Sequence, residues 1–422
     1  MKSILFKTLR SILSVLKKIF LVLLAFIKCL FTKDVWKTSF WGGTIAFVFA
    51  AVVIFFLNLF FSHDAITNGI VVPVVDDWYL NTYFDKHNSS VEDEGKNVDN
   101  IVIISIDEGW FTRGHFADAL KRIAKEKPKV IGIDATFSIS EGYDSVGNQQ
   151  LRDAIRYIKE VDSVNIVTAA YVDGNDTVHS FFTKELNLKY GFANQKSFEK
   201  YDFFYDDIST PRLATAIASA YNGRHFNTHD EFHVNYRKKN FPTIEHFGDT
   251  AEYSFRVDMN VDENTIVLIG QKSPMDVVQM PFVIGTYSHP NQLYGIEVVA
   301  YQLNTILAKK SDQDSSHHLP IRTLNPYVNG AIIFILVCLL NLLLLASEKT
   351  YRGAISIKPR KCRILSIVLG FIALVIVEYL IICICFWITD KFQYILNITL
   401  FFMAVLFIDR GNALFKLLTK KH

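Results

Sequence analysis

Four long apolar segments constrain the fold of this chain more than any other feature of its sequence. They occupy residues 40–61, 327–346, 364–388 and 394–408. A helix that crosses about 30 Å of hydrocarbon needs about 20 mostly apolar residues, because lipid offers no partners to exposed backbone groups. We therefore expect four transmembrane helices, one before the polar residues 62–325 and three after them.

The basic residues predict which side of the membrane each end occupies. Eight lysines or arginines precede the first apolar segment, up to Lys37, against one acidic residue, Asp34. The loop 347–363 and the tail 409–422 are also basic. Basic flanks stay in the cytoplasm, so we expect both termini inside and residues 62–325 outside. Residues 1–39 are then a basic amphipathic segment, cytoplasmic or at the interface. A crossing at 12–31 would reverse the domain and contradict the charge clusters.

Two polar residues lie at membrane depth, Glu378 in the third segment and Asn397 in the fourth. Polar groups in hydrocarbon find partners on facing helices. A structural role is favoured for Glu378. Membrane lipids, a second copy of the chain, or a separate membrane or cytoplasmic protein are the expected partners.

Composition excludes several protein classes. The net charge is +2, and its basic excess lies in the flanks of the apolar segments, so no nucleic acid is expected as a partner. None of the five cysteines lies in the polar domain, so its stability must come from a hydrophobic core without disulfides. The cysteines are Cys29, Cys338, Cys362, Cys383 and Cys385.

Strand-like and helix-like patterns alternate along the polar domain. Buried β-branched runs predict strands at 100–107, 129–134, 164–171 and 264–270. Amphipathic spacing predicts helices at 115–126, 151–159, 210–221 and 295–308. Ser209 is the expected cap of the third of these helices, with Pro211 in its first turn. Repeated alternation favours an α/β domain with a mainly parallel sheet.

Two of the predicted strands end in aspartate, at Asp107 and Asp134, and Asp276 follows a third strand. Ligands of open parallel sheets bind beyond the carboxyl ends of the strands. We expect the first two strands to be neighbours, so that the three carboxylates line one cleft. The alternative is that each aspartate caps the turn or helix that follows it.

The order of these motifs resembles the CHASE2 domain, an extracytoplasmic sensor module of bacterial membrane receptors. The resemblance lies in IVIISIDEGW, KPKVIGIDATFS, NYRKKNFPTIEHF, NTIVLIGQKSPMD and GIEVVA, and it covers roughly residues 70–410. Family members also carry one helix before the domain and commonly three after it. Two positions depart from the pattern: Trp110-Phe111-Thr112 replaces a Trp-Pro-Trp-Pro run, and Val299 stands where histidine is common.

The resemblance implies a tentative ligand-binding set and a mode of action. The matching positions with polar side chains are Asp107, Arg113, Asp134, Ser138, Asp276 and Glu297. CHASE2 receptors usually continue into a cytoplasmic kinase or cyclase, whereas this chain runs only to His422. We therefore expect a sensor subunit that signals through a separate effector.

No catalytic or cofactor motif supports an enzyme. Glycine-rich phosphate loops, nucleophile elbows and zinc helices are missing from the sequence. The cluster His225, His229 and His233 fits a loop that enters a strand better than a metal site. We expect no enzyme activity, no cofactor and no metal. A scaffold for envelope proteins is the alternative to a sensor, and an extracytoplasmic enzyme is a more remote one.

Overall fold

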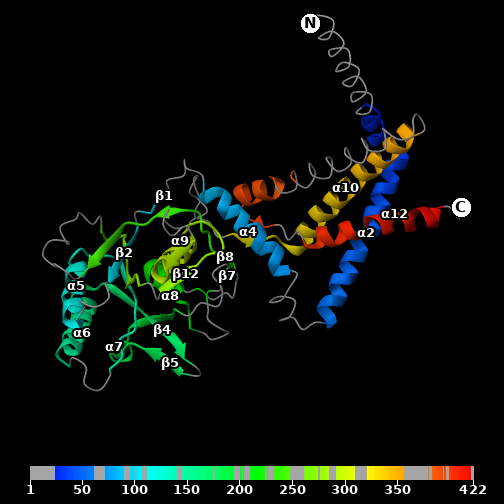
Figure 1. Ribbon diagram of the computed structural model, residues 1–422. Coiled ribbons are helices and arrows are strands. Elements are labelled where there is room, and N and C mark those ends of the chain that lie inside the picture. The colour runs from blue at the N-terminus through cyan, green and yellow to red at the C-terminus, as the bar shows by residue number, and fades with distance from the viewer. Residues whose placement is uncertain are drawn as a thin grey trace, which may run out of the picture. The chain divides into compact units, whose positions relative to one another are not determined.

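The computed structural model divides the chain into two compact units (Figure 1). The helical unit comprises Met1–Trp78 and Thr323–His422, and the α/β unit comprises Tyr79–Arg322. The structure describes residues 24–60, 72–89, 96–98, 100–106, 112–139, 145–173, 176–193, 200–201, 203, 210–223, 226, 232–247, 261–273, 276–284, 291–308, 321–355, 379, 383–392, 394–395 and 399–419.

The α/β unit alternates helices and strands as expected. Its helices are the end of α4 (Val72–Asn88), α5 (Arg113–Lys125), α6 (Ser145–Tyr157), the π-helical turn η1 (Ile158–Asp162), α7 (Phe181–Glu185), α8 (Leu213–Asn222) and α9 (Gly295–Leu307). Its strands are β1 (Lys96–Asn97), β2 (Ile101–Ile106), β3 (Val130–Asp134), β4 (Asn165–Asp173), β5 (Asp176–His179), β6 (Lys189–Phe192), β7 (Lys200–Tyr201), β8 (Phe232–His233), β9 (Lys239–Asn240), β10 (Thr243–Phe247), β11 (Ile266–Gln271), β12 (Val277–Gln279) and β13 (Gln292–Tyr294).

A seven-stranded sheet forms the centre of this unit. Its strand order is β10-β2-β11-β3-β4-β5, and β6 also pairs with β4. All of these pairings are parallel except that of β5 with β4. The predicted α/β class with a mainly parallel sheet is therefore confirmed. The predicted neighbourhood of β2 and β3 is wrong, because β11 lies between them and pairs with both.

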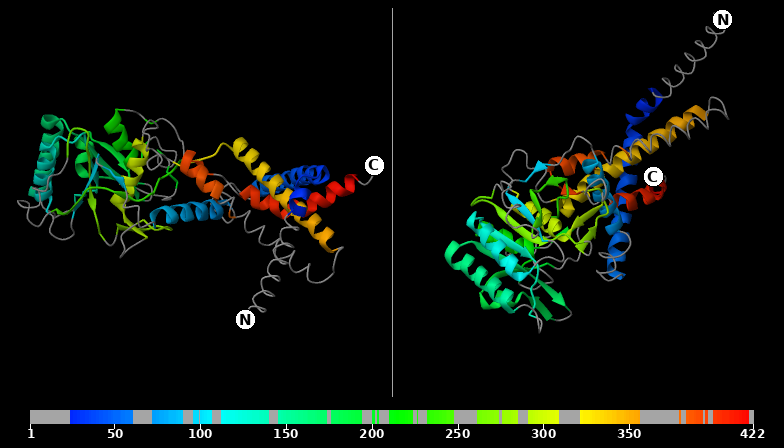
Figure 2. Two further views of the ribbon diagram at one scale, coloured as in Figure 1. Left: turned by 90° about the horizontal axis from the view of Figure 1, so that it is seen from above. Right: turned by 60° about the vertical axis from the view of Figure 1, so that its left-hand side comes forward.

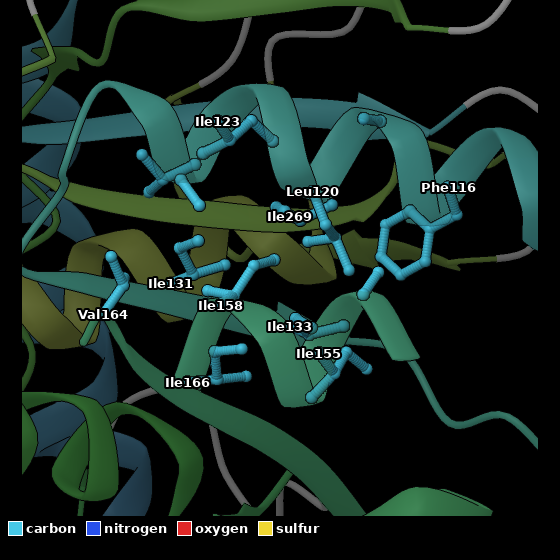
Figure 3. Packing of buried hydrophobic residues seen from close by; sticks show 14 of the residues in the cluster. Phe116, Leu120, Ile123, Ile131, Ile133, Ile155, Ile158, Val164, Ile166 and Ile269 are labelled. Carbon is cyan, nitrogen blue, oxygen red and sulfur yellow. The ribbon is translucent and has the colours of Figure 1, made fainter. Parts of the chain in front are cut away.

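One face of the sheet packs against α5 and α6. Alternate residues of the strands point to this face, as the two-residue period of a strand requires. Figure 3 shows Ile131, Ile133 and Ile269 from the sheet against Phe116 and Leu120 of α5. Figure 2 shows α5 and α6 side by side from two further directions. Burial of these apolar side chains is the main source of stability for a domain without disulfides.

The other face of the sheet packs against α8 and α9, and two glycines permit the close approach. A Cβ on Gly132 of β3 would lie 2.6 Å from Ile217 Cδ1 of α8. A Cβ on Gly270 of β11 would lie 3.0 Å from the side chain of Ile296 on α9. The Val-Ile-Gly and Leu-Ile-Gly patterns of these strands thus serve helix packing at the carboxyl half of the sheet.

The helix predicted after Ser209 begins later than expected. α8 starts at Leu213, its N-cap is Arg212 with extended backbone, and Ser209 lies outside the described residues. The main chain just before α8 is extended because it pairs with β6, where Phe192 N donates to Pro211 O at 3.0 Å. Pro211 therefore belongs to an extended segment and not to the first helical turn.

The helical unit contains the four apolar segments, of which the first, the second and most of the fourth are described. Its elements are α2 (Lys33–Phe60), α10 (Pro326–Ile355), α12 (Thr399–Thr419), and the short strands β14 (Arg322–Thr323) and β15 (Tyr394–Ile395). Within the described residues, two helices are long and apolar enough to cross a membrane, at Lys33–Val53 and Tyr327–Thr350. Most of the third segment, with Glu378, and Asn397 of the fourth lie outside the described residues.

The fourth segment differs from its predicted bounds. The helix there begins at Thr399 and continues through Arg410 to Thr419, so residues 409–419 are not a separate tail. Asp409 and Arg410 are exposed, whereas Gly411 and Asn412 are buried against the other helices. The charged pair therefore interrupts the hydropathy pattern without ending the helix.

Contacts among the three helices fix their relative directions. Between α2 and α10, Phe47 contacts Phe334 and Ser39 Oγ donates to Cys338 O at 2.7 Å, so the two helices are antiparallel. Between α2 and α12, Phe49 stacks on Phe407 and Gly42 contacts Gly411, so these helices are also antiparallel. It follows that α10 and α12 run in the same direction.

A buried polar layer joins all three helices. The side-chain amides of Asn341 on α10 and Asn412 on α12 bond reciprocally, at 2.9 and 2.7 Å. Asn341 Nδ2 also donates to Ser39 O of α2 at 3.1 Å. These three residues are almost fully buried. We call Ser39, Asn341 and Asn412 the polar layer.

Candidate functional site

The carboxyl ends of β2, β11 and β3 meet at one edge of the sheet. Gly270 of β11 lies in register with Ser105 of β2 on one side and with Asp134 of β3 on the other. Asp107 follows the last residue of β2 and lies outside the described residues. Asp134 is the last residue of β3, so one of the two predicted strand-end acids is placed at this edge.

Asp276 lies at the N-terminus of α9. Its carboxylate accepts the backbone N–H of Gly295, the first residue of the helix. A Cβ on Gly295 would lie 2.6 and 2.7 Å from the two carboxylate oxygens, so only glycine permits this approach. A carboxylate at a helix N-terminus satisfies a free donor and interacts favourably with the helix dipole. Asp276 is thus a helix cap as well as a member of the predicted set.

Asp134 and Asp276 interact, although their strands differ. Burial, and to a smaller extent the nearby charge of Asp276, raise the pKa of Asp134 to about 7. Burial also raises the pKa of Asp276, against the lowering effect of the Gly295 N–H bond. Two neighbouring carboxyls resist being ionised together. Near neutral pH the pair therefore holds a proton on Asp134 more readily than an isolated aspartate does.

Glu297 lies in the first turn of α9, where it caps the helix and pairs with a lysine. Its Oε2 accepts the backbone N–H of Tyr294 at 2.9 Å, and its Oε1 lies 3.0 Å from Lys272 Nζ. The side chains of this ion pair are 13% and 22% exposed, so water screens it only partly. Lys272 also lies over the Tyr294 ring, 5.6 Å from its centroid.

Arg113 and Ser138 form a second group, after β3 and at the start of α5. Arg113 Nη2 donates to Ser138 O at 2.6 Å, and Nη1 donates to Asn148 Oδ1. The guanidinium lies 5.9 Å from the ring centroid of Phe137 and 5.8 Å from that of Phe181. Ser138 thus contributes its carbonyl, while its side chain is exposed. Arg113 holds the segment after β3 against α5.

Sequence reasoning missed three of these participants. Lys272 was not singled out because a lysine after a strand is usually a solvated surface residue. Asn148 and Phe181 come from distant segments, and no local pattern connects them with Arg113. The Gly-x-Glu order of Gly295 and Glu297 was the available signal for the α9 cap, since glutamate at the third helical position often bonds back to the cap.

The group at the α9 N-terminus comprises Asp134, Asp276, Glu297 and Lys272. Two neighbouring carboxyls with raised pKa values can take up a proton, or accept hydrogen bonds from a cationic or hydroxyl-bearing group. The Lys272–Glu297 ion pair adds a charged group of each sign at the same helix end. Among the described residues, no group of three metal-ligating side chains could hold an ion.

Comparison with known proteins identifies the domain. A model of the CHASE2 domain family matches residues 49–343, well over half of the chain. The match begins within α2 and ends within α10, so it includes the α/β unit and parts of both helices. No curated protein and no solved structure matches the chain.

Proposed function

The chain belongs to the CHASE2 domain family, and we propose that it is a membrane receptor subunit whose extracytoplasmic domain senses a ligand and whose helices pass the signal to a separate effector. CHASE2 is an extracytoplasmic sensor domain family, which supports a sensor over a scaffold or an enzyme. The observation that carries the proposal is that one family match, over residues 49–343, spans the whole α/β unit together with parts of both flanking helices.

The helix directions support the proposed topology. Because α2 and α10 are antiparallel neighbours, the chain leaves and re-enters the membrane at one face, and residues between them belong to that side. In a topology in which α12 is also a span, its direction, which is that of α10, requires the chain between them to cross back an odd number of times. The third apolar segment is long enough for that crossing. We therefore propose four spans with both termini in the cytoplasm.

Cysteine labelling of intact cells will test this topology. In a chain without its five native cysteines, a membrane-impermeant maleimide should modify Ser89→Cys from outside and should not modify Ser347→Cys. Ser89 is exposed at the end of α4, and Ser347 precedes the basic loop after the second span. Permeabilised cells should label both positions, which controls for reactivity. Labelling of Ser347→Cys alone in intact cells would overturn the orientation.

The input site in this proposal is the group at the α9 N-terminus, with Arg113 and Ser138 in a supporting role. Asp134 and Asp276 would bind the ligand, and binding would change the contacts of Glu297 with Lys272 and with the start of α9. A change of charge on the acid pair acts directly on the first turn of α9, because Asp276 accepts its first N–H. Asp107 stays a predicted member of this site.

The output surface in this proposal is the C-terminal end of α12. Leu414, Leu417 and Leu418 are 38%, 62% and 57% exposed there, beyond the polar layer and beside Lys416. An exposed apolar stripe at the cytoplasmic end of a helix bundle suits a helical or membrane-bound partner. Anionic lipid and a second copy of the chain are the competing contacts.

Photo-crosslinking in the native host will test the output surface. A crosslinker at Leu417 should give a protein adduct whose yield changes in Asp276→Asn, which keeps an acceptor for Gly295 but removes the charge. Leu406 is the matched control, because it lies on the same helix and is 72% exposed. It should give lipid adducts only. Lipid adducts at both positions, or a protein adduct at Leu417 that ignores Asp276→Asn, would contradict signalling through α12.

A further inference from the structure

A short segment of the α/β unit is mostly buried although six of its nine residues are polar or charged. We call residues 232–240 the strap; it begins at β8 and ends at β9. Asn235 and Tyr236 are fully buried, and Arg237 and Lys239 are only 4% and 7% exposed. Buried polar groups need partners. The partners of the strap come from three separate parts of the chain.

The first part is the C-terminal end of α4. Asn88 Nδ2 donates to Tyr236 O at 3.0 Å, and Asn88 Oδ1 accepts from Lys238 N at 2.8 Å. Arg237 Nη2 donates to the Tyr83 hydroxyl, and its guanidinium lies 5.2 Å from the Tyr83 ring centroid. The Asn88 side chain of α4 therefore holds the main chain of the strap at Tyr236 and at Lys238. Along the chain, α4 follows α2.

The second part is the C-terminal half of α9. Asn235 N donates to Thr305 Oγ1 at 3.2 Å, and Lys239 N donates to the Tyr301 hydroxyl at 3.1 Å. The rings of Tyr236 and Tyr301 lie 5.5 Å apart. The backbone N–H groups of Asn235 and Lys239 thus donate to α9, whereas the backbone N–H of Lys238 donates to α4. It lies between the two helices and bonds to both.

The third part is the segment that leads to α10. His233 N donates to Ile321 O at 2.7 Å, and Ile321 N donates to His233 O at 3.1 Å. Ile321 is fully buried, and α10 begins shortly after it, at Pro326. One segment therefore bonds to the element that follows α2, to the helix that carries the candidate site, and to the residues that precede α10.

We propose that the strap is the coupling element of the domain, which makes α4, α9 and the segment at Ile321 respond as one body. The inference rests on the proposed sensor function, because it supplies the route from the α9 N-terminus to both membrane-connected segments. A displacement of α9 along its axis would carry Tyr301 and Thr305 against the strap. The strap would transmit this displacement to Asn88 and to Ile321, because the side chains that make these bonds are buried.

Amide hydrogen exchange of the full chain in lipid nanodiscs will test the coupling. Asn88→Ala should speed exchange at least about tenfold in the strap and also at Tyr301–Leu307, which Asn88 does not contact. Asp85→Ala is the matched control one turn away. Asp85 Oδ1 accepts Val283 N at 2.7 Å, and α9 is not part of that bond, so loss of the carboxylate should speed exchange near Val283 and leave α9 unchanged. Equal effects of the two variants on α9, or no effect of Asn88→Ala there, would overturn the proposal.

A second variant approaches the strap from the other helix. Thr305→Val keeps the side-chain shape and removes the acceptor of Asn235 N, so it should speed exchange at Tyr83–Asn88 of α4. If Asn88→Ala fails to fold, this variant decides the question alone, and an undisturbed α4 overturns the coupling. Exchange reports no signalling, whereas the Leu417 adduct does. If the exchange experiments show no coupling but the yield of the Leu417 adduct still responds to Asp276→Asn, the strap proposal is rejected and the sensor proposal stands. If they show coupling but the adduct yield does not respond, the sensor proposal is rejected.

Discussion

Replacing Asp134 by asparagine is expected to stabilise the protein at pH 8 and to remove most of the pH dependence of its stability between pH 4 and pH 7. The pKa of Asp134 is about 7 in the folded protein and 3.8 in the unfolded chain, so folding favours the protonated form. Stability from this group is complete below pH 3.8 and is lost as pH rises through 7. The loss is at most about 4 kcal/mol, and less if solvent reaches this half-buried residue.

Thermal unfolding of the full chain in detergent at pH 5 and pH 8 will measure the effect. The wild type should unfold at a lower temperature at pH 8, and Asp134→Asn should reduce that difference. Asp262→Asn is the control of opposite sign. The pKa of Asp262 is lowered by bonds from Asn264 N and from the Thr265 hydroxyl, so its contribution is lost only on acidification below its ordinary pKa. A pH 5 to pH 8 difference that is undiminished in Asp134→Asn would refute the buried proton.

Replacing Gly411 by alanine is expected to separate α12 from α2, although alanine is the better helix former. A Cβ at this position would lie 2.4 Å from Gly42 O and 3.2 Å from Ala46 N. These are backbone atoms of α2, which cannot rotate away as a side chain can. Overpacking of this kind costs about 1–3 kcal/mol. The shift would also pull Asn412 from Asn341 and leave two buried amides without their reciprocal bonds.

Equilibrium unfolding in mixed detergent micelles will compare Gly411→Ala with Gly330→Ala. Gly330 lies on α10 of the same bundle, and the nearest atom to a Cβ there is Phe47 Cζ at 4.0 Å. Gly330→Ala should therefore be neutral or stabilising, by up to about 1 kcal/mol from helix propensity. If both variants behave alike, the contact between Gly411 and Gly42 does not hold the bundle together.

Local patterns were sufficient to predict the strands at the centre of the sheet. The run that ends at Ile106 and the run that ends at Asp134 are apolar at almost every residue, which only a strand covered on both faces tolerates. The order of the strands was not predictable, because the insertion of β11 between β2 and β3 depends on residues far apart in sequence. For the same reason the carboxylates were placed on neighbouring strands that are not neighbours.

The candidate site was predictable in part. Asp134, Asp276 and Glu297 stand at strand and helix ends, where a carboxylate has a local reason to be. The pairing of Arg113 with Phe137 and Phe181 has no such local signal, since Phe137 of the segment after β3 and Phe181 of α7 meet the arginine only in the folded chain. α4 was missed because its apolar residues form no single stripe, and its contacts to the strap are made by Asn88 and Tyr83.

The position of β2 in the sheet has a consequence for biogenesis. Its two partners, β10 and β11, are the last strands of the large sheet to be synthesised, while β2 is the first. Until the chain has been synthesised through Gln271, this strand, which is apolar at every residue but Ser105, has two unpaired edges. Unpaired apolar edges can pair with strands of other chains. A chain truncated between β3 and β10 would therefore yield an aggregation-prone fragment instead of a smaller folded domain. The unpaired edges of β2 in the nascent chain must therefore be protected from aggregation until β10 and β11 have been synthesised.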